Sequence, residues 1–267
     1  MVRTRTASML TRRFDGDGGN TRRPDDLIVE EPLAIWLDEI QVSATMRTPG
    51  HDFELAAGFL HGEGALDGAP IVGIRYCGTG APTDSDFNVV TVETGGVAPE
   101  PRPRLGSITS SCGVCGSDAI AELTERLRVL AAHEPWPVES LLAMPDALLD
   151  GQPLFASTGA VHGAAAVDRS GRVLVTREDI GRHNAVDKVV GRLLLDGALP
   201  ATDLALIVSG RGSFEMVQKA WAAGFTALVA VSAPSSLAVQ TARRAGMTFV
   251  GFARDGAGTL YSPEHRA

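Results

Sequence analysis

The sequence predicts an α/β protein with a smaller, mainly β N-terminal lobe and a C-terminal lobe built on a mixed sheet with flanking helices. Buried strands alternate with helices through the second half of the chain, which is typical of α/β layers. The first half has short paired apolar runs and one helical stripe. A Pro/Arg segment at 99–105 separates the halves and predicts a boundary there. We therefore expect a tail over residues 1–23, a lobe over 24–105 and a domain over 106–267.

In the N-terminal lobe the pattern predicts mainly strands. The runs at 33–37 and 40–46 are expected to pair around a tight turn at Asp38-Glu39. An apolar stripe predicts a helix soon after Pro49-Gly50, formed by Phe53, Leu55, Ala56, Phe59 and Leu60. Further strands are expected at 27–30, 71–76 and 88–93.

In the C-terminal lobe Ser117 is the expected N-cap of a first helix. A second helix at 139–149 should break at Pro145. Strands are expected at 161–167 and 173–176, followed by a helix at 185–195 that Asn184 caps. Regular alternation then predicts strands at 204–209, 227–232, 249–252 and 259–261, with helices at 214–223 and 235–245.

Composition excludes several classes of protein. The chain has 267 residues and a net charge of −8, which disfavours a general nucleic-acid-binding role. No apolar stretch approaches the roughly 18–20 residues of a membrane span. Three cysteines are too few for a disulfide scaffold, so we expect a cytoplasmic protein.

The charge is unevenly distributed. Residues 1–23 contain six arginines and two aspartates, which gives +4 and leaves −12 on the rest. The segment has no apolar core of a secretory signal, and FDGDGGN is typical of flexible coil. We predict a disordered tail, acting as a solubilising extension or as an arm that docks on an acidic partner.

The most specific chemical feature is Cys112-Gly113-Val114-Cys115, followed by Gly116 and a predicted helix. A structural zinc site would need two more ligands, but Cys77, His162 and His183 are isolated. A thioredoxin-like dithiol would follow the first strand of its fold, and two inert thiols in a glycine turn remain possible. A position before a helix lowers a thiol pKa, so we favour a cysteine that carries sulfur as a persulfide.

A second group of polar residues lies in R177-E-D-I-G-R-H-N-A-V-D-K188. A solvated helix start would explain Glu178, Asp187 and Lys188, and a cap would explain Asn184. Neither explains Arg182 and His183 beside them, so we expect a functional site here.

Two small-residue loops follow buried strands, Ser209-Gly210-Arg211-Gly212-Ser213 and Ser232-Ala233-Pro234-Ser235-Ser236. Backbone N–H groups in such loops approach anions closely, and the helix that follows favours negative charge. Two such loops side by side predict a phosphate-bearing ligand at the strand ends.

Several segments together resemble a known family. They are MRTPG (46–50), SSCGVCG (110–116), TGAVHGAA (158–165), REDIGRHNAVDKVVG (177–191), SGRGSFEMVQKA (209–220) and VSAPSSLAV (231–239). In this order they resemble the formate dehydrogenase accessory sulfurtransferase family, FdhD, over about residues 25–261.

The resemblance implies a sulfur carrier. Members take sulfur from a cysteine desulfurase as a persulfide and pass it to the molybdenum or tungsten of bis-molybdopterin guanine dinucleotide, their cargo, before it enters formate dehydrogenase. The catalytic pair corresponds to Cys112, the persulfide carrier, and Cys115. The resemblance further implies a cytidine deaminase-like C-terminal lobe and a homodimer. From the isolated positions of Cys77, His162 and His183 we expect no structural metal.

The family's cargo-binding stretch corresponds to residues 252–257, although Ala257 replaces a residue that is often basic. With the polar groups above, the predicted cargo-binding residues are Arg182, His183, Ser209, Gly210, Arg211, Ser232, Phe252, Ala253, Arg254, Asp255, Gly256 and Ala257. Arginines that converge locally would let an acidic protein bind a pyrophosphate.

Two other functions are alternatives to a sulfur carrier. A zinc hydrolase with deaminase-like chemistry needs H-x-E and P-C-x-x-C, but His162 precedes Gly163-Ala164 and no P-C-x-x-C occurs. A non-catalytic chaperone that binds and delivers the molybdenum cofactor is the remaining alternative. Such a chaperone should tolerate loss of the cysteines.

Overall fold

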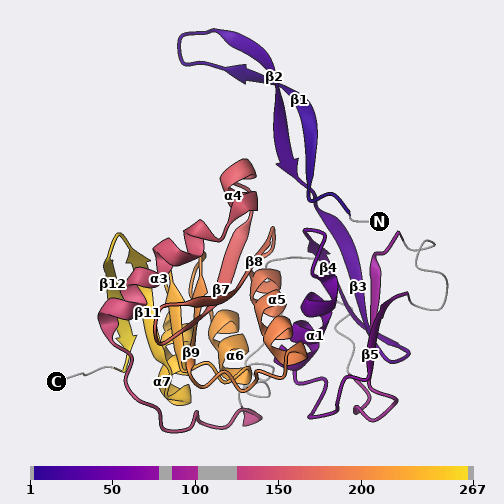
Figure 1. The fold of residues 1–267 in the computed structure, drawn as a ribbon, viewed down its shortest axis with the longest axis vertical. Helices are drawn as coiled ribbons and strands as arrows, with labels where there is room; N and C mark the ends of the chain where they lie inside the picture. Colours follow the sequence, from indigo (N-terminus) through magenta and orange to yellow (C-terminus); the bar gives the residue numbers. More distant parts are fainter. Residues whose placement is uncertain (1–2, 78–85, 102–124, 264–267) are drawn as a thin grey trace.

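The computed structural model describes residues 3–77, 86–101 and 125–263, which form two lobes side by side and a projecting hairpin (Figure 1). The cysteine pair and the helix expected from Ser117 lie outside these ranges. No helix in the described part of the chain is long and apolar enough to cross a membrane.

The N-terminal lobe is a four-stranded sheet covered by one helix, in the order β4-β3-β6-β5. The strands are β3 (Glu31–Leu37), β4 (Ile40–Arg47), β5 (Gly73–Tyr76) and β6 (Val89–Glu93). β3 and β4 pair antiparallel around Asp38-Glu39, as expected, while β6 runs parallel to β3. Helix α1 (Asp52–Gly62) packs Leu55, Ala56 and Leu60 against the apolar side chains of this sheet.

The C-terminal lobe is a six-stranded mixed sheet in the order β12-β11-β10-β9-β7-β8. Its strands are β7 (His162–Asp168), β8 (Val173–Asp179), β9 (Leu204–Val208), β10 (Ala227–Ala230), β11 (Thr248–Arg254) and β12 (Ala257–Ser262). β9, β10 and β11 are parallel, whereas β7 is antiparallel to both β8 and β9. The expected mixed sheet is therefore confirmed.

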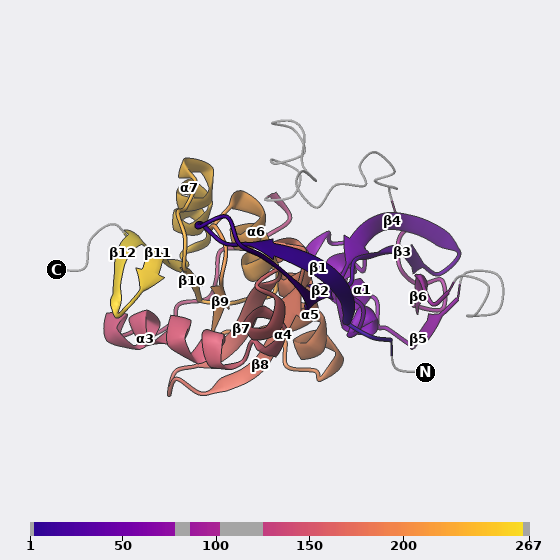
Figure 2. The same ribbon diagram turned by 90° about the horizontal axis from the view of Figure 1, so that it is seen from above.

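Helices cover both faces of this sheet because its strands are apolar on both sides. Figure 2 shows α3 on one side and α6 and α7 on the other. Leu206 and Leu228 face the core formed with α5 (Arg182–Leu195), α6 (Phe214–Ala222) and α7 (Ser236–Ala245). Ala205 and Ile207 face α3 (Val138–Asp150). The alternation follows the two-residue period of a strand.

Two helix expectations were wrong. α3 continues through Pro145, which is buried while Leu141, Met144 and Leu148 pack against the sheet; this packing outweighs the hydrogen bond that proline removes. α5 begins at Arg182, and its preceding residue is Gly181 rather than a capping Asn184. The Asn184 amide instead donates to the Met46 carbonyl and to Asp179.

Residues expected to be a disordered tail form a hairpin instead. β1 (Thr6–Phe14) and β2 (Asn20–Ile28) pair antiparallel along their whole length and project from the body (Figure 1). The Asp/Gly segment that indicated coil is the hairpin's turn, closed by hydrogen bonds between Asp15 and Gly19 and between Gly18 and Asp15. At the base, Arg3 binds Glu31 and Asn88, which ties the hairpin to the N-terminal lobe.

Candidate functional site

One edge of the C-terminal sheet gathers most of the predicted binding residues. β8, β9, β10 and β11 all end at this edge, and antiparallel β7 begins there with His162. Arg182 begins helix α5 shortly after β8, Ser209 and Ser232 lie in the loops after β9 and β10, and Phe252 lies near the end of β11. Ligands of open α/β sheets bind at such strand ends.

Backbone hydrogen bonds hold the loops at this edge together. Ser232 N–H donates to the Gly210 carbonyl at 3.3 Å, and Phe252 N–H donates to the Ser232 carbonyl at 3.1 Å. Ser209 Oγ accepts from Gly163 N–H at 3.0 Å. Hydrogen bonds therefore join the loops after β9 and β10 to each other and to the end of β11.

The middle of this edge is suited to an anion. Gly210 lies against His162 and Arg182, since a side chain there would be 3.4 Å from His162 Nδ1 and 3.8 Å from Arg182 Cδ. Arg182 Nε is buried and has no hydrogen-bond partner among the described residues. Burial, together with the electrostatic effect of nearby Arg182 and His183, lowers the pKa of His162. Ser209 Oγ lies 3.5 Å from His162 Nδ1.

The other predicted residues differ in accessibility. His183 Nε2 lies 2.5 Å from a carboxylate oxygen of Glu215, while Arg211 is exposed. Phe252 is 45% exposed and Ala253 is fully buried in the core. Arg254, Asp255, Gly256 and Ala257 form the tight turn between β11 and β12, where Asp255 and Gly256 have positive φ.

A cavity of about 510 Å³ opens beside the anion-suited region, between the strand ends and the segment from α3 to α4 (Pro153–Thr158). His162, Ser209, Arg254 and Asp255 are among its polar lining residues. Leu148, Leu149 and Phe155 give it apolar walls. Its volume is within the range of small-molecule sites.

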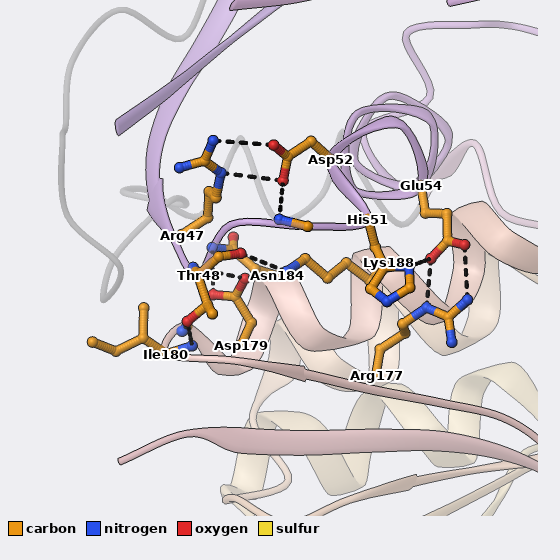
Figure 3. Close-up of polar contacts among 12 residues, drawn as sticks. Arg47, Thr48, His51, Asp52, Glu54, Arg177, Asp179, Ile180, Asn184 and Lys188 are labelled. Atoms are coloured by element: carbon orange, nitrogen blue, oxygen red, sulfur yellow. Dashed lines mark hydrogen bonds and ion pairs between the residues drawn. The ribbon is translucent and has the colours of Figure 1, made fainter. Parts of the chain in front are cut away.

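Several residues of the motif at 177–188 join the two lobes instead of forming the expected functional site. Asp179 is fully buried and accepts hydrogen bonds from Thr48 N–H, Gly181 N–H and the Asn184 amide, as Figure 3 shows in part. Lys188 Nζ lies 2.7 Å from Asp179 Oδ2. Thr48 belongs to the N-terminal lobe, so this buried ion pair joins the two lobes.

Further ion pairs extend the same junction (Figure 3). Arg177 makes two hydrogen bonds to the carboxylate of Glu54 on α1, at 2.5 and 2.7 Å. Burial opposes the charge of Glu54, but hydrogen bonds from Arg177 and His51 outweigh it and lower the Glu54 pKa to about 2. Within the N-terminal lobe, buried Arg47, which precedes Thr48, makes two hydrogen bonds to Asp52.

Two glycines let the helices of the junction touch backbone to backbone. α1 crosses α5 where Gly58 faces Gly191, and a Cβ on Gly191 would lie 1.8 Å from the Glu54 carbonyl oxygen. A Cβ on Gly58 would lie 1.9 Å from the Asp187 carbonyl oxygen. Asp187 also binds Lys219 of α6 at 2.6 Å. Of the motif, Arg182 and His183 lie at the strand-end edge, and Ile180 lines the cavity there.

Of the three cysteines, the structure describes Cys77. Cys112 and Cys115 lie outside the described residues, and half-buried Cys77 accepts a hydrogen bond from Arg75 at the end of β5. Within the described ranges, no three His, Cys, Asp or Glu side chains are grouped to hold a metal ion.

Comparison with known proteins decides the family. The model of the FdhD/NarQ family matches residues 28–267. The chain belongs to the FdhD/NarQ family. Curated relatives named sulfur carrier protein FdhD match nearly end to end. The one from Streptomyces avermitilis is 47% identical, covering 94% of this chain and 92% of its own. The one from Mycobacterium tuberculosis is 43% identical, covering 98% of each.

A solved structure has the same fold. The crystal structure of a protein assigned as a formate dehydrogenase accessory protein from Desulfotalea psychrophila superposes with a TM-score of 0.78 at 27% identity. It covers 98% of this chain and 99% of its own. The structural match therefore includes the hairpin and both lobes. The resemblance to the FdhD family that the sequence motifs indicate is confirmed.

Sequence reasoning missed two residues of this FdhD/NarQ protein that line the cavity. His162 stands at the strand-end edge only because β7 runs antiparallel to β9, a direction that the motif TGAVHGAA does not reveal. Gln152 also lines the cavity, from the short connection between α3 and α4, and no motif drew attention to it.

Proposed function

We propose that this protein is a sulfurtransferase that carries sulfur as a persulfide on Cys112. The proposal is supported by the FdhD/NarQ membership and by the relatives' name, sulfur carrier protein. The chain also has the C-G-V-C-G sequence that such a carrier needs. The Cys112 thiolate attacks the terminal sulfur of a persulfide on a cysteine desulfurase. The donor's S–S bond breaks, its cysteine leaves as a thiolate, and Cys112 keeps the sulfur atom.

The acceptor in this proposal is the molybdenum of bis-molybdopterin guanine dinucleotide, bound as cargo and destined for formate dehydrogenase. The strand-end edge supports it, because half-buried Arg182, whose Nε is buried without a partner among the described residues, and the close-packed Gly210 loop suit a pyrophosphate. The described residues at this edge offer donors to anions and no grouped metal ligands, which fits a cargo held through its nucleotide. The homodimer, the cytoplasmic location and the cytidine deaminase-like lobe stay predictions.

The cysteines separate a sulfur carrier from a chaperone. In a cell that lacks the native protein, the Cys112→Ser, Cys115→Ser double variant should fail to restore formate dehydrogenase activity, since an alcohol cannot carry sulfane sulfur. Cys77→Ser is the control and should restore activity as the wild type does. Full activity with the double variant would favour the non-catalytic chaperone.

The anion site predicts the effect of one arginine. Arg182→Ala should weaken GDP binding by on the order of 1.5–3 kcal/mol, because one charge-assisted hydrogen bond is lost. Titration calorimetry measures it. Arg192→Ala removes an arginine from the same helix whose side chain is 46% exposed and pairs with Asp196, and should leave GDP affinity unchanged. Equal losses in the two variants would contradict a site at Arg182.

A further inference from the structure

One face of the projecting β1–β2 hairpin is both apolar and basic. Side chains two residues apart lie on the same face of a strand. The register therefore places Leu10 with Pro24, Arg12 with Arg22, and then Phe14 on one face, which we call the arm face. Leu10 is 64% exposed and Phe14 is 72% exposed, and the other three side chains are exposed as well. Arginine and aromatic side chains together are typical of protein interfaces.

The two arginines of the arm face indicate an acidic partner. Arg12 and Arg22 are directly opposite each other across the hairpin, and like charges in this arrangement destabilise a sheet. A two-stranded hairpin is marginally stable by itself. This one is tied at its base, where Arg3 donates to Asn88 at 2.7 Å and Val29 N–H donates to the Arg5 carbonyl at 2.8 Å. Carboxylates of a partner would remove the repulsion along its length.

The turn of the hairpin favours a protein partner over a membrane. An anionic lipid surface attracts basic segments, and apolar side chains anchor them in it. The turn at the far end of this hairpin has neither property, because it consists of glycines and of Asp15 and Asp17, which are exposed. Its two carboxylates would be repelled by anionic headgroups. The side of the hairpin, rather than its tip, is therefore the surface suited to binding.

The hairpin stands close to the strand-end edge. β2 contacts α4, and α4 lies beside that edge (Figure 1). A protein that is held on the hairpin is therefore brought near the edge at which the proposed cargo is bound. The hairpin also precedes the part of the chain that the family model matches, which begins at residue 28. These positions favour a role in choosing the partner rather than in binding the cargo.

We propose that the arm face docks an acidic, partly apolar surface of the protein that receives the cargo. In the proposed function, on which this inference rests, that protein is formate dehydrogenase. Arg12 and Arg22 pair with its carboxylates, while Leu10 and Phe14 pack against apolar side chains beside them. The hairpin thereby holds the recipient next to the strand-end edge.

Binding of purified, cofactor-free formate dehydrogenase to the full-length protein tests the arm face. Arg12→Glu should weaken this binding at least about tenfold, because a charge-assisted contact is lost. Arg13→Glu is the matched control. It changes the net charge by the same amount at the next position, but Arg13 pairs with Thr21 on the opposite face of the hairpin. This variant should bind as the wild type does.

The same substitution separates binding from folding. Arg12→Glu places opposite charges across the pair with Arg22, so the melting temperature should stay the same or rise while the affinity falls. A purely structural role of Arg12 would instead lower both. Phe14→Ala should also weaken binding about tenfold with no change in melting temperature, because this exposed ring is an aromatic anchor of the interface.

Several outcomes would overturn the proposal. They are equal losses of affinity in Arg12→Glu and Arg13→Glu, and a wild-type protein that does not bind formate dehydrogenase. A third is an Arg12→Glu variant that binds formate dehydrogenase normally but loses self-association in sedimentation or binding to anionic vesicles. That result would assign the arm face to a second copy of the chain or to a membrane.

Failure of the docking surface is distinguishable from failure of the sulfur chemistry. Persulfide formation on Cys112 is measured independently by mass. Selective loss of binding in Arg12→Glu, with no persulfide on the wild type, would leave the docking surface standing and refute the sulfur carrier. A persulfide on Cys112 without selective loss of binding would refute only the docking surface.

Discussion

Gly191→Ala should lower the free energy of unfolding by about 3 kcal/mol, the upper range for overpacking a buried contact. The new methyl group would lie 1.8 Å from the Glu54 carbonyl oxygen and 2.8 Å from Gly58 N. Both are backbone atoms of α1, so no side chain can rotate away. The helices must separate, and with them the two lobes.

Gly62→Ala is the matched control for this experiment. Gly62 ends the same helix α1, but its nearest neighbour would be Lys219 Cγ at an ordinary 3.5 Å. Alanine there should be neutral or slightly stabilising, because it favours the helix. Urea unfolding of both variants measures the difference. Equal stability of the two would refute the backbone contact between α1 and α5.

Asp179→Ala should be at least as destabilising, by about 3–5 kcal/mol, because it leaves a buried charge without its counter-ion. Lys188 is 1% exposed, and its ammonium group would retain the Thr48 carbonyl as its hydrogen-bond acceptor. Thr48 N–H, Gly181 N–H and the Asn184 amide would also lose their shared acceptor.

The control for Asp179 is a carboxylate in a surface pair. Asp196 binds Arg192 where both side chains are more than 40% exposed, so Asp196→Ala should cost at most about 1 kcal/mol. Denaturant unfolding compares the two. A loss at Asp179 no larger than that at Asp196 would show that the motif does not hold the lobes together.

The sequence predicted the C-terminal sheet well because its strands and helices alternate with short loops. It failed for the hairpin, since Met9, Leu10 and Phe14 are exposed and β1–β2 has no buried face to produce an apolar alternation. The sequence also predicted a helix break at Pro145 that does not occur. Packing of Leu141, Met144 and Leu148 stabilises this helix, and that tertiary packing cannot be predicted from the proline alone.

The candidate site could likewise be predicted only in part from the sequence. The sequence indicated a functional site within residues 177–188 but not the junction that Asp179 makes between the lobes, because its partner Thr48 is 131 positions away. The strand-end loops were predicted from local pattern alone. Gln152 and His162 were not, since their importance depends on a cavity that forms only when α3, α4 and β7 pack together.

The central claim is that sulfur travels on Cys112, and mass spectrometry after incubation with a cysteine desulfurase and cysteine tests it most directly. The account predicts that the intact protein gains one sulfur atom, that peptide mapping places it on the Cys112 peptide, and that reductant removes it. Cys115→Ser should keep the adduct and Cys112→Ser should lose it. A wild-type protein that gains no sulfur, or a Cys112→Ser variant that gains it as readily, would contradict the account.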